Sequence, residues 1–155
     1  MKIIEKIHDF LPLSFVLIFC TFLIVVNLDK PRVLVLHSYD LNYTWVKNIN
    51  EGLNRVLKNK NYSIKWHYMD TKRHPYPDYM ARAGKRAKQL VEEFYPDVLI
   101  ACDDDAQREV GKYFVNHPQI NIVFAGVQGE LANYNYKEGK NVTGIMELPT
   151  LQGIK

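Results

Sequence analysis

Short apolar runs alternate along most of the chain with longer segments whose apolar residues recur at helical spacing. The runs RVLVL and DVLIA are continuous and rich in Val, Leu and Ile, which is typical of strands buried on both faces. Strand–helix–strand repetition with short connections predicts a parallel sheet covered by helices. The expected strands are residues 32–36, 63–68, 97–101, 120–125 and 142–146, and the expected helices begin at Thr44, Pro77 and Asp104.

The strand expected at residues 63–68 differs from the others because its apolar and polar residues alternate. Ile64, Trp66 and Tyr68 alternate with Lys65 and His67. Alternation is typical of a strand with one solvated face, often at a sheet edge. An edge position for the second strand predicts an α/β fold with a doubly wound parallel sheet in the flavodoxin-like order 2-1-3-4-5.

The third helix is expected to run from about Asp104 to His117-Pro118. Asp104 and Gln107 have the spacing of a capping box, and acidic residues favour a helix N-terminus. Capping is therefore the expected role of the acidic run 103–105, and a role at a binding site is compatible with it.

The composition excludes several classes of protein. The 155 residues are 47 % hydrophobic and 24 % charged, which fits one folded domain and not a disordered chain. Cys20 and Cys102 are the only cysteines, too few for a zinc cluster or a disulfide framework. The net charge of +3 is too small to indicate nucleic-acid binding, and the basic run after Lys72 is expected to be solvated surface.

The N-terminal segment is a separate unit, residues 1–30. Residues 10–28 are almost purely apolar, and about 19 helical residues span roughly 28 Å, close to the hydrocarbon thickness of a membrane. The segment is expected to be a signal anchor or a cleaved signal peptide, and a buried core helix is the third alternative. An anchor is favoured because no Ala-x-Ala cleavage pattern follows. Either main alternative exports the rest of the chain and makes the domain extracytoplasmic.

Polar or glycine-containing loops follow the expected strands, at the edge where ligands bind in such sheets. No nucleophile elbow, phosphate-binding loop, dinucleotide fingerprint or metal-ligand spacing is present in the sequence. We therefore expect binding without catalysis, no metal and no cofactor. An enzyme using Asp103 or His37 as a base is the less favoured alternative. The candidate ligand-binding residues are His37, Ser38, Tyr39, Asp103, Asp104, Gly126 and Val127.

Several of these segments resemble one known family. They are residues 34–39 (LVLHSY), Trp45, and residues 68–74 (YMDTKRH), 99–106 (LIACDDDA), 123–127 (VFAGV) and 141–145 (NVTGI). The pattern is similar to that of ABC-transporter substrate-binding-protein-like proteins, and it covers about residues 32–148. The resemblance implies two Rossmann-like lobes with a ligand cleft between them. The family includes stand-alone solute-binding proteins and extracytoplasmic sensor domains of membrane histidine kinases. Cys102 stands where the family pattern leads us to expect Ser or Thr.

The resemblance gives the expected organisation and function. Residues 31–148 correspond to a first lobe and residues 149–155 to the start of a crossover into a second lobe, so that the chain looks truncated. We expect an extracytoplasmic solute-binding module whose closure is sensed by an ABC permease. The first alternative is a ligand-sensing domain joined to a membrane-anchored kinase module, and the second is an anchored stub that binds no ligand.

Overall fold

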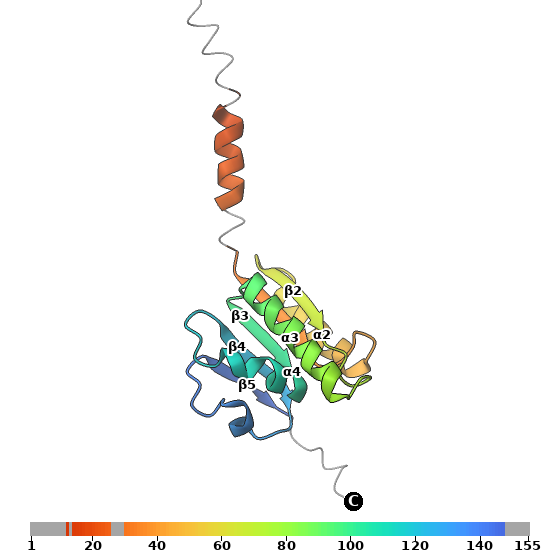
Figure 1. The fold of residues 1–155 in the computed structure, drawn as a ribbon. Helices are drawn as coiled ribbons and strands as arrows, with labels where there is room; N and C mark the ends of the chain where they lie inside the picture. Colours follow the sequence, from red (N-terminus) through yellow and green to blue (C-terminus); the bar gives the residue numbers. More distant parts are fainter. Residues whose placement is uncertain (1–11, 13, 26–29, 148–155) are drawn as a thin grey trace, which may run out of the picture. The chain divides into compact units, whose positions relative to one another are not determined.

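The structure is a computed structural model that describes residues 12, 14–25 and 30–147 (Figure 1). The chain divides into two compact units, Met1–Lys30 and Pro31–Lys155. In the first unit residues 12 and 14–25 are helical, and large hydrophobic side chains from Phe15 to Val25 are exposed. No helix in the described ranges has both the length and the apolar character needed to cross a membrane. The anchor expected over residues 10–28 extends at both ends outside the described residues.

The second unit contains a five-stranded parallel sheet in the order β2-β1-β3-β4-β5 (Figure 1). This order confirms the flavodoxin-like fold and the edge position of the second strand. The chain order reverses between β1 and β3, which is where doubly wound sheets bind ligands. The strands are β1 (Arg32–His37), β2 (Ser63–Tyr68), β3 (Val98–Cys102), β4 (Asn121–Val127) and β5 (Val142–Met146).

Helices cover both faces of the sheet because each central strand is apolar on both sides. Along β1, Leu34 and Leu36 pack in one core cluster with α3 and α4, whereas Val33 and Val35 pack in another with α2. Figure 1 shows α3 and α4 on one face and α2 on the other. The helices are α2 (Thr44–Leu57), α3 (Pro77–Phe94) and α4 (Asp104–Glu109), and two 3₁₀ turns follow, η1 (Gly111–Phe114) and η2 (Leu131–Tyr134).

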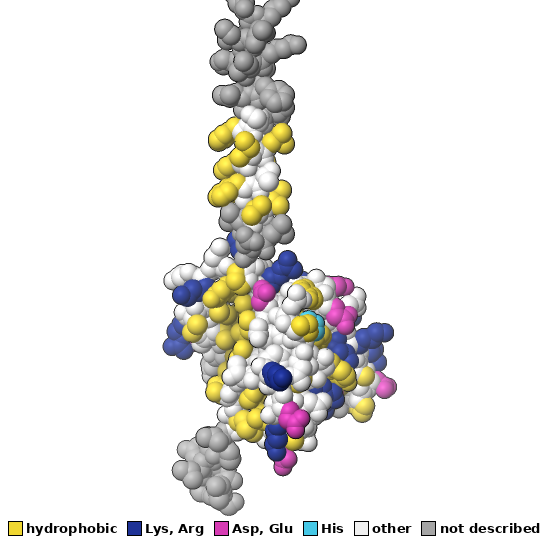
Figure 2. Space-filling view, turned by 90° about the vertical axis from the view of Figure 1, so that its left-hand side faces the viewer, with side chains coloured by type: hydrophobic (Ala, Val, Ile, Leu, Met, Phe, Trp, Pro, Cys, Tyr) yellow, Lys and Arg dark blue, Asp and Glu magenta, His cyan; other side chains and the backbone are white. Residues whose placement is uncertain are grey.

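The face of the sheet under α2 is covered less completely than the opposite face. Val123 and Ala125 of β4 are only half-buried there, and the side chain of Ile145 on β5 is 72 % exposed. Figure 2 shows hydrophobic side chains gathered in a band on the side of the domain that carries β4 and β5. The main core therefore lies on the α3 and α4 side, where the largest cluster of buried residues is found.

The third helix is shorter than the sequence predicted. It ends at Glu109, because Val110 has the non-helical angles φ −133° and ψ −63°, and a 3₁₀ turn replaces the expected continuation to His117. Gly111 in this turn packs against the Tyr136 ring, where an added Cβ would lie 2.2 Å from the tyrosine oxygen. Tyr136 therefore packs against the 3₁₀ turn at Gly111. The spacing of apolar residues in the sequence did not predict this turn.

The predicted capping box of α4 is wrong. Asp103, rather than Asp104, is the N-cap residue, and its carboxylate accepts a hydrogen bond from the Asp104 backbone N–H. The Gln107 amide donates to the carbonyl oxygens of Ala101 and Asp103 and does not reach back to the Asp104 backbone. The Asp104 carboxylate has other partners, described below.

Candidate functional site

The carboxyl edge of the sheet places Asp103 directly after β3, the strand next to the reversal in strand order. The Asp103 backbone has φ 72° and ψ 165°, a conformation that is rare outside glycine and costs about 1–3 kcal/mol. Its backbone N–H donates to the Ala125 carbonyl of β4, which helps to hold it there. Backbone strain of this kind gathers at binding sites, so this residue is a natural centre for the candidate site.

Aromatic rings and one lysine surround this edge of the sheet. Tyr39 makes edge contacts with the rings of Tyr43 and Trp45, at centroid distances of 5.2 and 6.1 Å. The Lys72 ammonium lies 4.8 Å from the Tyr39 ring and 4.1 Å from the Tyr43 ring, and it donates a hydrogen bond to the Tyr43 hydroxyl. The Asp103 carboxylate lies close enough to the Tyr39 hydroxyl for each group to shift the pKa of the other. We call Tyr39, Tyr43, Trp45, Lys72 and Asp103 the strand-end cluster.

Gly126 is required by the position of Trp45. It has φ +66°, at a register shift near the end of β4, and an added Cβ would lie 2.4 Å from the Trp45 ring. A side chain at this position would therefore displace the indole. Gly126 belongs to the site by shaping it, and it offers no side-chain contact to a ligand.

His37 and Ser38 are neighbours in sequence, yet they point to opposite faces of the sheet, and both are buried. His37 lies on the α2 side, where its Nε2–H donates to the Asn50 Oδ1 and its ring stacks on Tyr68. Ser38 lies on the α4 side, where its hydroxyl donates to the Cys102 carbonyl and accepts from the Ala106 N–H. Neither side chain reaches the surface beside Asp103, where the sequence had placed both.

Asp104 and Val127 also differ from expectation. The Asp104 carboxylate accepts hydrogen bonds from the backbone N–H groups of Gln128 and Gly129 and from the Tyr134 hydroxyl. It therefore organises the loop after β4 and does not extend toward the strand-end cluster. Val127 is fully buried in the main core. Of the seven predicted residues, the structure brings together Tyr39, Asp103 and Gly126.

Burial controls the charge of the groups at this site. Desolvation raises the pKa of the Asp103 carboxyl, and the nearby Tyr39 hydroxyl opposes that rise in part. Desolvation, followed by the nearby Asp103 carboxylate, raises the pKa of the Tyr39 hydroxyl. Tyr39 is therefore a neutral donor at pH 7. Burial also raises the pKa of the adjacent Cys102 thiol to about 12, which keeps it protonated and unreactive.

Three members of the cluster, Tyr43, Trp45 and Lys72, were not among the predicted binding residues. Tyr43 directly precedes α2, and Lys72 lies in the loop after β2, inside a basic run interpreted as solvated surface. Lys72 could have been predicted to lie here, because the loop after β2 begins at the same sheet edge as the loops after β1 and β3. Nothing local marked Tyr43, because its contact with Tyr39 depends on the path of the loop between them.

The cluster can stack a ring or apolar group, accept hydrogen bonds through Asp103 and donate them through Lys72. Among the described residues, no group of three or more His, Cys, Asp or Glu side chains is placed to hold a metal ion.

Comparisons with known proteins support the fold and go no further. No protein-family model matches the sequence, and no curated protein matches it. A solved structure described as a conserved domain protein from Vibrio cholerae O1 biovar El Tor has a TM-score of 0.59 to this chain at 21 % sequence identity. The match covers 81 % of this chain and 42 % of that one, so the chain spans less than half the length of that protein. The similarity places this domain in a fold shared with a longer bacterial protein.

Proposed function

We propose that this chain supplies one wall of a small-molecule binding site, as a solute-binding module of the ABC-transporter substrate-binding-protein type. The observation that carries the proposal is the strand-end cluster. Aromatic rings, an ammonium group and a strained, half-buried carboxylate converge there on the edge of the sheet beside the reversal in strand order. Binding sites commonly combine apolar walls with a few well-placed polar groups in this way.

The cluster indicates what kind of solute would bind. Tyr39 and Trp45 offer ring faces and edges to an aromatic or apolar group. The Asp103 carboxylate would accept from a hydroxyl or ammonium group of the solute, and Lys72 would donate to a carboxylate or carbonyl oxygen. Lys72 lies over the two tyrosine rings, and a solute with a cationic group would compete with it for them. A small polar organic molecule with an apolar part fits these requirements.

The setting that we propose is extracytoplasmic, with residues 10–28 as a membrane anchor. The helix at residues 14–25 supports this because its large hydrophobic side chains are exposed on the unit by itself. Ligand-driven closure against a second surface would then be sensed by a permease, or by a kinase module in a sensor protein. Extraction of bacterial membranes at alkaline pH tests the anchor. Release of the full-length chain into the soluble fraction would contradict it.

Trp45 provides a direct assay of solute binding. We would titrate the full chain with amino acids, sugars and aromatic acids while following tryptophan emission, and compare it with Trp45→Phe to separate Trp45 from Trp66. A binding solute should change the Trp45 signal saturably. Asp103→Asn keeps the shape of the side chain and should weaken binding by about tenfold or more, the usual effect of losing a hydrogen bond to a charged group.

Asp78→Asn is the matched control, because Asp78 is an exposed aspartate in the first turn of α3 and is not part of the strand-end cluster. It should leave the affinity unchanged. The proposal fails if no solute gives a saturable response, or if Asp103→Asn and wild type bind every solute equally well. Product analysis after incubation completes the test, since turnover lost in Asp103→Asn would identify an enzyme instead.

A further inference from the structure

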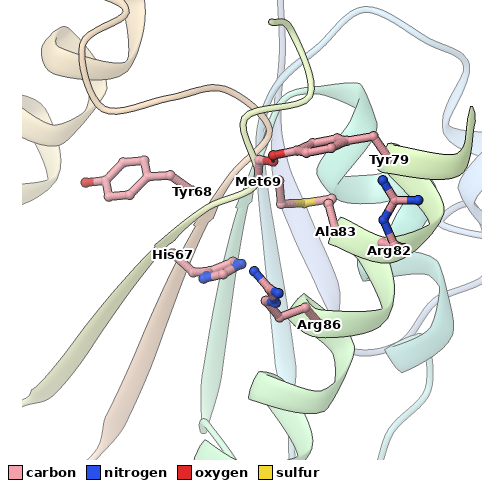
Figure 3. Close-up of a pocket in the computed structure, with 7 residues that line it drawn as sticks. All are labelled: His67, Tyr68, Met69, Tyr79, Arg82, Ala83 and Arg86. Atoms are coloured by element: carbon pink, nitrogen blue, oxygen red, sulfur yellow. The ribbon is translucent and has the colours of Figure 1, made fainter. Parts of the chain in front are cut away.

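A second pocket lies between the edge strand β2 and helix α3, apart from the strand-end cluster. Its volume is about 170 Å³. Met69 and Ala83 supply apolar lining, and the polar side chains that face it come from His67, Arg82 and Arg86 (Figure 3). Pockets for drug-sized ligands measure roughly 300–1,000 Å³, so this one suits a small group.

The strand and helix periodicities bring these basic groups together. On β2, His67 shares the α3 side with Lys65, whose ammonium lies 4.9 Å from the Phe94 ring of α3. Arg82 and Arg86 are four residues apart, so they lie on one face of α3. Figure 3 shows the Arg86 guanidinium and the His67 ring pointing toward each other, the Arg82 guanidinium extending toward Tyr79 at the other end of the pocket, and the Tyr68 side chain pointing away.

The charges of Arg82 and Arg86 are not neutralised by neighbouring carboxylates. Elsewhere in the domain Arg73 is paired with Asp70 and Arg108 with Asp105. Within residues 30–147, neither Arg82 nor Arg86 has an ion pair or a side-chain hydrogen bond. Two guanidinium groups thus line one pocket with no carboxylate of the described residues paired to either.

The histidine adds a hydrogen-bond donor. Burial, and then the positive charge of Arg86, lower the pKa of His67 below its usual value of 6.5. The ring is therefore mainly neutral at pH 7 and carries one N–H. Tyr79 is already engaged, since its hydroxyl donates to the Met69 carbonyl.

We propose that this pocket binds a small dianionic oxyanion, namely a phosphate group, between Arg82, Arg86 and His67. Each guanidinium can donate two parallel hydrogen bonds to a phosphate, and together the two balance its charge. The phosphate belongs either to a small soluble ester or to a lipid headgroup. The site is independent of the proposed solute site.

The test is a calorimetric titration of the full chain with inorganic phosphate at fixed ionic strength. Binding should saturate, and Arg82→Gln and Arg86→Gln should each weaken it about tenfold or more, as expected for charged hydrogen bonds. Lys85→Gln removes the same charge from an exposed position of α3 that does not line the pocket, and it should change the affinity by less than about twofold. Asp103→Asn should have no effect on phosphate, which separates this site from the solute site.

Glycerol 3-phosphate and phosphatidylcholine vesicles with and without phosphatidic acid distinguish the two sources. Arginine-dependent binding of glycerol 3-phosphate would identify a soluble ester, and arginine-dependent binding of the phosphatidic acid vesicles alone would identify a lipid headgroup. The proposal is overturned if none of these probes binds saturably. It is also overturned if Lys85→Gln weakens binding as much as Arg86→Gln, because the effect would then be one of general charge.

Discussion

Replacing Ser38 with alanine should destabilise the domain, because its hydroxyl joins β3 to α4. The hydroxyl donates to the Cys102 carbonyl over 2.9 Å and accepts from the Ala106 N–H over 2.8 Å. In Ser38→Ala the Cys102 carbonyl keeps the hydrogen bond from the Ser38 backbone N–H. The Ala106 N–H, one of the first-turn donors that a helix cannot satisfy itself, is left buried without a partner.

The expected loss of stability in Ser38→Ala comes from the single unsatisfied Ala106 N–H. A buried polar group left unsatisfied costs about 1–3 kcal/mol, so we expect the free energy of unfolding to fall by about 2 kcal/mol. With a urea m-value of about 2 kcal/mol/M, typical of a small domain, the unfolding midpoint should fall by about 1 M.

Urea unfolding of the full chain, followed by tryptophan fluorescence, measures this change. Ser63→Ala is the control, because Ser63 is a half-buried strand serine whose backbone N–H bonds to the Pro31 carbonyl. It should lower the free energy of unfolding by less than about 0.5 kcal/mol. A Ser38→Ala loss as small as that of the control would refute the reasoning, since the Ala106 N–H would then have another partner.

Three further changes test other parts of the structure. Burial lowers the pKa of His37 to about 4 from 6.5, so the unfolded state binds more protons between these values. His37 should therefore contribute a loss of about 2 kcal/mol of stability from pH 7.5 to 5, measured by urea titrations of wild type against His37→Phe. His37→Phe should remove that contribution, and an unchanged slope would contradict the assignment. Gly126→Ala should cost about 1–2 kcal/mol for its positive φ and more for displacing Trp45, seen as a shifted Trp45 emission, whereas an unaltered spectrum would count against it. Asp104→Ala, which loses the acceptors for two backbone N–H groups, should cost about 1–3 kcal/mol and speed amide exchange at residues 128–134; unchanged exchange would argue that the loop is held by other contacts.

The sequence alone predicted the parallel sheet, its strand order and the edge position of β2. Those features depend on local patterns, namely the two-residue period of β2 and the apolar runs of β1 and β3. The start of α3 was also predicted from a local signal, because Pro77 is tolerated only in the first turn of a helix. By contrast, the length of α4 was overestimated, since a helical run of apolar residues does not show where tertiary packing turns the chain at Val110.

Only the tertiary structure decided which polar side chains form a site. Local pattern says which face of a strand is apolar, and it does not say which partner a loop residue finds across the fold. His37 and Ser38 were expected together at the surface, yet strand geometry turns them to opposite faces and hydrogen bonds bury both. Lys72 and Asp103, by contrast, approach the same tyrosine only because β1 lies between β2 and β3. The sequence thus determined the scaffold, and long-range contacts selected the site.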